Sequence, residues 1–138
     1  SDLYHFILFG GPGDSFCTEL AQDIPGDRLS NFQGKCTIEE SGAILKSCDF
    51  VVANDTGLMH MADALKKPSI LFLGPTSREM GCLPFHPKSI VLEKEMWCRP
   101  CSKNGQAPCI RKQRYCLTDI SPQMALEAVK RMGSFLAL

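Results

Sequence analysis

The stretch DFVVANDTGLMH, residues 49–60, decides the fold of this chain. Its first residues are mostly apolar, which predicts a short buried strand over residues 49–53. The Asn-Asp-Thr-Gly turn that follows leads into a helix predicted over residues 58–67, which Pro68 stops. One side of this helix is apolar and is expected to face a sheet: Leu58, Met61, Ala62 and Leu65. A buried strand, a tight turn and an amphipathic helix form the repeating unit of an α/β fold.

The same alternation extends in both directions along the chain. Thr37 and Glu40 have the spacing of a capping box at the start of a helix, and Ser121-Pro122 puts proline at a first helical position. The other predicted strands cover residues 4–9, 28–32, 69–73 and 89–92, and the other predicted helices cover residues 15–22, 37–48 and 121–136. The apolar stripe of the last helix is Met124, Ala128, Val129, Met132 and Phe135.

This pattern predicts a doubly wound α/β fold in which a parallel sheet has helices on both faces, because its strands read as continuous apolar runs. At 138 residues the chain has the length of one domain. We therefore expect a single domain over residues 1–138, with a cysteine-rich loop at about 96–118 and a terminal helix at about 121–136.

Charge and hydropathy limit the classes of function. Lys and Arg number 15 and Asp and Glu number 15, so the net charge is 0 and the basic surface of a nucleic-acid binder is not expected. No apolar run approaches the roughly 20 residues that cross a bilayer. No export signal is visible, which favours a cytoplasmic protein. The chain enters a strand-like run by Tyr4, which indicates a piece of something longer.

Ligands of open parallel sheets bind beyond the carboxyl ends of the strands, and residues 55–60 lie at such an end. The N–H groups of Thr56, Gly57 and Leu58 open a helix, so together with the helix dipole they form a phosphate site. His60 stands in the first turn, within reach of an anion there. Asp55 or Thr56 is expected to cap the helix. The alternative is that Asp55 is only an N-cap and that His60 is a surface residue.

Two other strand ends carry suitable residues. Gly10, Gly11 and Asp14 follow the first strand, where glycines allow close approach to a ligand and the carboxylate can accept from a ribose hydroxyl. Gly74 and Thr76 follow the strand at 69–73. Each of these segments is also compatible with a plain turn.

Eight cysteines form two groups. Cys98, Cys101, Cys109 and Cys116 are spaced so that four thiolates would hold a structural zinc ion. Redox catalysis by a Cys-Arg-Pro-Cys motif is an alternative, but it requires the first thiol at a helix start. A third possibility is free thiols or disulfides that brace a loop. The remaining four, which are scattered, read as small buried apolar residues: Cys17, Cys36, Cys48 and Cys82.

Three segments together resemble a known family: DTGLMHMA (55–62), PSILFLGPT (68–76), and the late cysteines followed by DISP (119–122). They resemble the carboxyl-terminal half of the heptosyltransferases of glycosyltransferase family 9. The resemblance implies a GT-B architecture of two Rossmann-like domains, with this chain as the nucleotide-sugar domain. Family members transfer heptose from ADP-heptose to the inner core of lipopolysaccharide, inverting the anomeric centre without a catalytic metal or other required cofactor.

The resemblance also implies residue roles. Asp55, Thr56, Gly57, Leu58 and His60 would hold the diphosphate and the sugar hydroxyls. A nucleotide-binding set would lie around the adenosine: Gly10, Gly11, Asp14, Lys35, Cys36, Gly74 and Thr76. The catalytic carboxylate belongs to the amino-terminal domain, so this chain alone is expected to be inactive.

The implied partners are the nucleotide-sugar donor and the lipopolysaccharide inner-core acceptor, reached through the other domain. Nucleic acid is not among them, and the full enzyme would act in the cytoplasm, at the cytosolic face of the inner membrane, with peripheral membrane contact. Two hypotheses compete with this one. The first is another GT-B transferase, or an epimerase, that uses a UDP-sugar. The second is a zinc-braced interaction module without a nucleotide site.

Overall fold

The computed structural model describes residues 4–136 of the chain. Its internal contacts divide it into two compact units, residues 1–44 and 45–138, which are described separately here. Within residues 4–136, no helix has the length and apolar character needed to cross a membrane.

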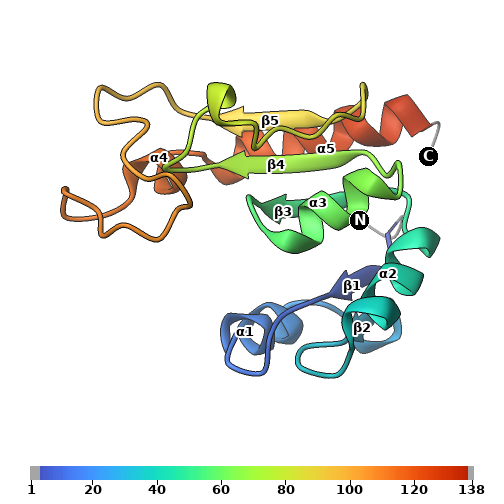
Figure 1. Cartoon of the computed structure of the whole chain (residues 1–138). Coiled ribbons are helices and arrows are strands. Elements are labelled where there is room, and N and C mark those ends of the chain that lie inside the picture. Colours follow the sequence, from blue (N-terminus) through green and yellow to red (C-terminus); the bar gives the residue numbers. More distant parts are fainter. Residues whose placement is uncertain (1–3, 137–138) are drawn as a thin grey trace. The chain divides into compact units, whose positions relative to one another are not determined.

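The first unit is a parallel strand pair with its connecting helix. Strand β1 (Phe6–Leu8) is followed by α1 (Phe16–Gln22), the short 3-10 turn η1 (Gly26–Arg28) and β2 (Leu29–Asn31). The two strands pair in parallel, with Phe6 opposite Leu29 (Figure 1). Parallel neighbours need a crossover of this kind, since a tight hairpin would make them antiparallel. The predicted strands at 4–9 and 28–32 are confirmed with shorter bounds.

Helix α2 (Ile38–Ser47) begins with the predicted capping box. The Thr37 N–H donates to Glu40 Oε2 over 2.7 Å, and the Glu40 N–H donates to Thr37 Oγ1 over 3.2 Å. Both side chains therefore satisfy backbone donors that an isolated helix start would leave to water, a gain of about 1 kcal/mol.

The second unit is built around a three-stranded parallel sheet of order β3-β4-β5. Its elements are β3 (Val51–Asn54), α3 (Gly57–Ala64), β4 (Ser69–Leu73), the 3-10 turn η2 (Arg78–Met80), β5 (Ile90–Glu93), α4 (Tyr115–Thr118) and α5 (Pro122–Leu136). In the register of the sheet, Val52 lies beside Ile70, and Ile70 lies beside Ile90. The strand predicted at residues 69–73 is confirmed at both ends.

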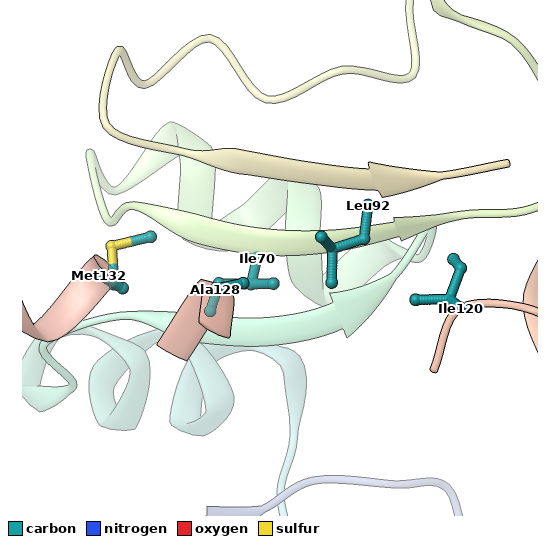
Figure 2. Close-up of a cluster of buried hydrophobic side chains, with 5 residues drawn as sticks. All are labelled: Ile70, Leu92, Ile120, Ala128 and Met132. Atoms are coloured by element: carbon teal, nitrogen blue, oxygen red, sulfur yellow. The ribbon is translucent and has the colours of Figure 1, made fainter. Parts of the chain in front are cut away.

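Helices cover both faces of this sheet, as predicted for an α/β fold (Figure 1). On one face, Ile70 and Leu92 pack with Ala128 and Met132 of α5 and with Ile120 (Figure 2). On the other face, two leucines of β4, Leu71 and Leu73, pack with Met59 of α3. Successive side chains of a strand point to opposite faces, so an unbroken apolar strand such as β4 is required for two apolar layers.

The predicted sheet-facing side of α3 is shifted in the structure. Its fully buried residues are Met59 and Ala62, whereas Leu58, Met61 and Leu65 are half-buried. The apolar residues of this helix are nearly continuous, so spacing alone fits more than one rotation, and contact with β4 decides between them. The helix also ends earlier than predicted, because Lys66 adopts a left-handed φ of 59° and the Lys67 N–H returns to the Ala62 carbonyl oxygen.

Helix α5 confirms the predicted terminal helix but not all of its stripe. Phe135 was expected to be buried, yet its ring is exposed, with the Arg131 guanidinium carbon 5.1 Å from its centroid. Phe135 therefore takes part in a cation–π contact at the surface and does not pack in the core.

We expect Met132→Ala to lower the free energy of unfolding by about 2–5 kcal/mol, because it removes a fully buried side chain that fills the space between α5 and the sheet. Leu126→Ala, on the exposed side of the same helix, serves as the control and should cost about 0.5 kcal/mol or less. Urea unfolding measures both values. Equal losses for the two variants would contradict the packing described here.

Candidate functional site

The carboxyl end of the three-stranded sheet brings together residues from two predicted strand ends. The hydroxyl of Thr76, after β4, donates to Asp55 Oδ2 over 3.2 Å. The other carboxylate oxygen of Asp55, after β3, lies 3.2 Å from His60 Nε2 on α3. Thr76 is buried, whereas the His60 ring is half exposed. Asp55 therefore holds the histidine at the mouth of the site, and Thr76 holds Asp55 from below.

The start of α3 presents unpaired backbone donors beside this cluster. Thr56 occupies the N-cap position in extended conformation, and its side chain makes no capping hydrogen bond. The Asp55 oxygens bond Thr76 and His60 and not the N–H groups of the helix start, so the expectation that Asp55 or Thr56 caps the helix with its side chain is wrong. Within residues 4–136, no group accepts from the N–H groups of Gly57 and Leu58. Free N–H groups, the helix dipole and a histidine in one place favour an anion.

Arg99, which the sequence did not single out, supports the site from the cysteine-rich loop. Its Nε and Nη2 donate to the Thr76 carbonyl oxygen over 3.3 and 3.0 Å, and its Nη1 donates to the Lys94 carbonyl oxygen over 2.5 Å. Nη2 also pairs with Glu93 Oε2 over 3.2 Å, and the Arg99 side chain is only 7% exposed. A second arginine, Arg78, pairs with the other oxygen of Glu93. The backbone of Thr76 is therefore held by a buried cation.

Gly74 is required by packing at this strand end. A Cβ at this position would lie 3.1 Å from side-chain atoms of Leu117, closer than most real contacts of a Cβ. The Cys101 N–H donates to the Pro75 carbonyl oxygen over 3.1 Å, so the loop is joined to the strand end directly after Gly74.

Cys82 is a second residue of this site that was not expected from its position in the sequence, where it was grouped with the scattered cysteines. Burial raises the pKa of its thiol, and the neighbouring Asp55 carboxylate raises that pKa further, while a hydrogen bond with Thr76 lowers it. The thiol therefore stays protonated beside the carboxylate. No periodicity marks this position in the sequence, because Cys82 lies in the irregular loop that follows η2.

The first unit brings together the other predicted residues at the carboxyl ends of β1 and β2. The Gly11 N–H donates to Asp14 Oδ2 over 2.6 Å, so this carboxylate orders its own loop. The Gly34 N–H donates to the Gly10 carbonyl oxygen over 2.8 Å, which joins that loop to the one containing Lys35 and Cys36. The Lys35 ammonium donates to the Asn31 carbonyl oxygen over 2.9 Å.

The close contact between these loops restricts two glycines. A Cβ at Gly10 would meet the Cys17 sulfur at 2.8 Å. Gly34 has a φ of +63°, and a Cβ there would meet the Pro12 Cα at 3.0 Å. Only glycine fits both positions without a shift of the neighbouring chain.

All eight cysteines are free thiols in this structure. The four late ones, Cys98, Cys101, Cys109 and Cys116, line one small cavity. Within residues 4–136, however, no three Cys, His, Asp or Glu side chains are grouped so that they could hold a metal ion. The arrangement of these cysteines therefore does not support the zinc hypothesis. Cys98 also lies outside any helix, so the condition for thioredoxin-like chemistry is not met.

Of the four scattered cysteines expected to be small buried apolar residues, only Cys17 is buried. Cys17 and Cys116 are buried, and burial raises the pKa of each thiol. Near Cys116, Arg99 lowers the thiol pKa, while Cys101 and Cys109 raise it. Cys36, Cys48 and Cys82 are half-buried.

Comparison with known proteins gives a consistent result. The family model described as glycosyltransferase family 9 (heptosyltransferase) matches residues 3–130. Lipooligosaccharide heptosyltransferase 2 of Haemophilus influenzae is 32% identical over 139 residues, covering 94% of this chain and 38% of that protein. The enzyme of the same name from Campylobacter jejuni is 25% identical over 135 residues, covering 94% of this chain and 42% of that protein.

A solved structure shares the fold. The structure of E. coli ADP-heptose LPS heptosyltransferase II superposes with a TM-score of 0.73 at 25% identity, over 94% of this chain and 36% of that chain. This chain thus spans about two fifths of the length of the curated relatives it matches.

We expect Arg99→Met to destabilise the second unit by about 2 kcal/mol, because it removes hydrogen bonds from a buried cation and leaves the Thr76 carbonyl oxygen unpaired. Arg78→Met is the matched control, because Arg78 pairs with the same glutamate but is 51% exposed, and it should cost less than about 1 kcal/mol. Thermal unfolding with hydrogen exchange of the Cys101 amide tests this. Similar effects of the two substitutions would refute the supporting role of Arg99.

Asp55→Asn should lower the pKa of the Cys82 thiol, because it removes a negative charge that disfavours the thiolate. Alkylation of Cys82 at about pH 8.5, near the ordinary thiol pKa, should therefore become faster. Peptide mass spectrometry resolves it from Cys17, whose pKa is raised by burial and by Asp14 and whose rate should stay unchanged. An unchanged rate at Cys82 would show that Asp55 has no influence on this thiol.

Proposed function

This chain belongs to glycosyltransferase family 9 (heptosyltransferase), and from this membership we propose that it is the donor-binding part of a heptosyltransferase of lipopolysaccharide synthesis. The donor is ADP-heptose. The observation that carries the proposal is the cluster of Asp55, His60 and Thr76 beside the unpaired N–H groups at the start of α3.

The diphosphate of the donor would sit at this helix start. The N–H groups of Gly57 and Leu58 donate to phosphate oxygens. His60 Nε2 is held by Asp55, so the ring donates to the phosphate from Nδ1, as a doubly protonated imidazolium. The chain has a net charge of 0, so the attraction comes from oriented donors and not from a basic surface.

Asp55 and Thr56 would face the sugar. A carboxylate accepts hydrogen bonds from sugar hydroxyls, and Thr76 orients Asp55 for this task. Thr56 is exposed at the N-cap position and its hydroxyl is free of the helix, so it can donate to the donor as well.

For the first unit, taken by itself, we propose nucleotide contacts in two loops that are joined to each other. Lys35 and Cys36 lie in the loop after β2, and the loop after β1 is joined to it by the bond between Gly34 and Gly10. Asp14 Oδ2 accepts from Gly11, which holds the carboxylate in a fixed orientation from which it can accept from a ribose hydroxyl. Gly10 and Gly11 let the backbone approach the ligand.

The chemistry proposed is electrostatic. As the bond between heptose and phosphate breaks, negative charge develops on the departing ADP, and the preorganised N–H groups with His60 stabilise it. The proposed reaction inverts the anomeric centre and needs no metal, because these donors neutralise the leaving group. The base that activates the acceptor hydroxyl would come from the remaining length of the enzyme, with the inner-core acceptor. The site of action would be the cytosolic face of the inner membrane.

Calorimetric titration of the chain with ADP and with UDP tests the donor. We expect ADP to bind more tightly than UDP, and His60→Ala to weaken ADP binding at least about tenfold, the loss of one charge-assisted hydrogen bond. His86→Ala is the control, because that ring only accepts the Lys88 N–H in a turn of the same unit.

Tighter binding of UDP would favour the competing UDP-sugar enzyme. An unchanged ADP affinity in His60→Ala would contradict the proposed binding of the phosphates at the start of α3. Asp55→Asn should weaken binding of ADP-heptose more than binding of ADP, since its partner is the sugar.

A further inference from the structure

The cysteine-rich segment concentrates the positive charge of an otherwise neutral chain. Residues 94–118 contain six basic residues and one acidic residue, Glu95. The basic residues are Lys94, Arg99, Lys103, Arg111, Lys112 and Arg114. Arg99 is buried and paired with Glu93, so it does not contribute to the surface. Lys103, Lys112 and Arg114 are exposed.

The same segment exposes two large apolar side chains. Trp97 is 82% exposed and Ile110 is 71% exposed. The stretches that carry them lie side by side, because Arg111 Nη1, next in the chain to Ile110, lies 3.7 Å from the sulfur of Met96, next in the chain to Trp97. The Arg111 guanidinium is in turn packed 4.3 Å from the centroid of the Tyr115 ring.

We propose that this surface docks on a membrane of anionic lipids. Trp97 and Ile110 enter the interface between water and acyl chains, and Lys103, Lys112 and Arg114 contact the head groups. Tryptophan is favoured at that depth because its ring is largely apolar while its N–H remains hydrogen-bonded. Each basic residue near an anionic leaflet adds about fivefold to the binding constant.

The cavity lined by this segment is too small to receive a side chain of a protein partner. It has a volume of about 10 Å³, room for one water molecule and not for a partner's side chain. Trp97 and Ile110 instead project from the loop, as residues do that insert into a fluid interface. A nucleic acid would use the lysines and arginines, but it has no use for an exposed isoleucine.

The docking surface is joined to the site described above. Arg99 and Cys101 bind the backbone of Thr76 and Pro75, so the loop cannot move independently of the strand end that orients Asp55. If the proposed function holds, the membrane contact would keep the donor site at a fixed height above the bilayer that anchors the acceptor.

Trp97 is the single tryptophan of the chain, so its fluorescence reports docking without a label. We expect its emission to shift to the blue with vesicles of equal parts phosphatidylglycerol and phosphatidylcholine, and to shift little with phosphatidylcholine alone. High salt should reduce the blue shift, because it screens the attraction between the basic residues and the anionic lipids. Lys112→Gln should weaken binding to the anionic vesicles about fivefold. Lys130→Gln, an exposed lysine of α5, is the matched control and should bind as the parent does.

Sedimentation with the same vesicles gives a second readout, in which Ile110→Ser should lose binding. No blue shift, equal loss in Lys112→Gln and Lys130→Gln, or binding to RNA with no binding to vesicles would overturn the proposal. ADP titration of Lys112→Gln and Ile110→Ser separates the two proposals. Unchanged ADP affinity with lost vesicle binding supports docking, whereas absence of ADP binding in every variant counts against the donor site alone.

Discussion

The Asp55 carboxylate is the contact on which the arrangement of the site depends. One oxygen bonds His60, five residues later at the start of α3, and the other bonds Thr76, which follows β4, 21 residues later. The parallel sheet makes this possible, because it puts the carboxyl ends of consecutive strands at the same edge. Without the carboxylate, His60 would be an unrestrained, half-exposed side chain.

Below this contact lies a second layer of polar groups. Arg99 fixes the carbonyl oxygen of Thr76 and is itself paired with Glu93 at the end of β5. A buried cation of this kind is costly unless all its partners are in place. The site is therefore tied to the cysteine-rich loop, whose four late cysteines line a cavity together with this arginine.

Much of the fold could be predicted because its signals are local. The apolar run at 69–73 and the capping box at Thr37 each depend on a few neighbouring residues, and both are confirmed. The rotation of α3 could not be predicted, because Met59 and Leu58 are both apolar and only contact with Leu71 and Leu73 distinguishes them.

The site shows the same limit. Asp55 and His60 follow a strand in a recognisable pattern, so their proximity was predictable. Arg99 and Cys82 reach the same site from irregular loops, where the sequence has no helical or strand periodicity from which their positions could be predicted. The spacing of the late cysteines suggested zinc, but spacing along a loop does not determine whether the sulfur atoms converge.

A nitrogen–proton NMR spectrum of this chain, titrated with ADP, tests the central claim most directly. We expect the largest shifts at the amides of Gly57 and Leu58 and at the His60 ring, because these groups would contact the diphosphate. Shifts concentrated at the amino ends of the strands, around Lys88 and Ile90, or no shifts at the start of α3 at saturating ADP, would contradict it.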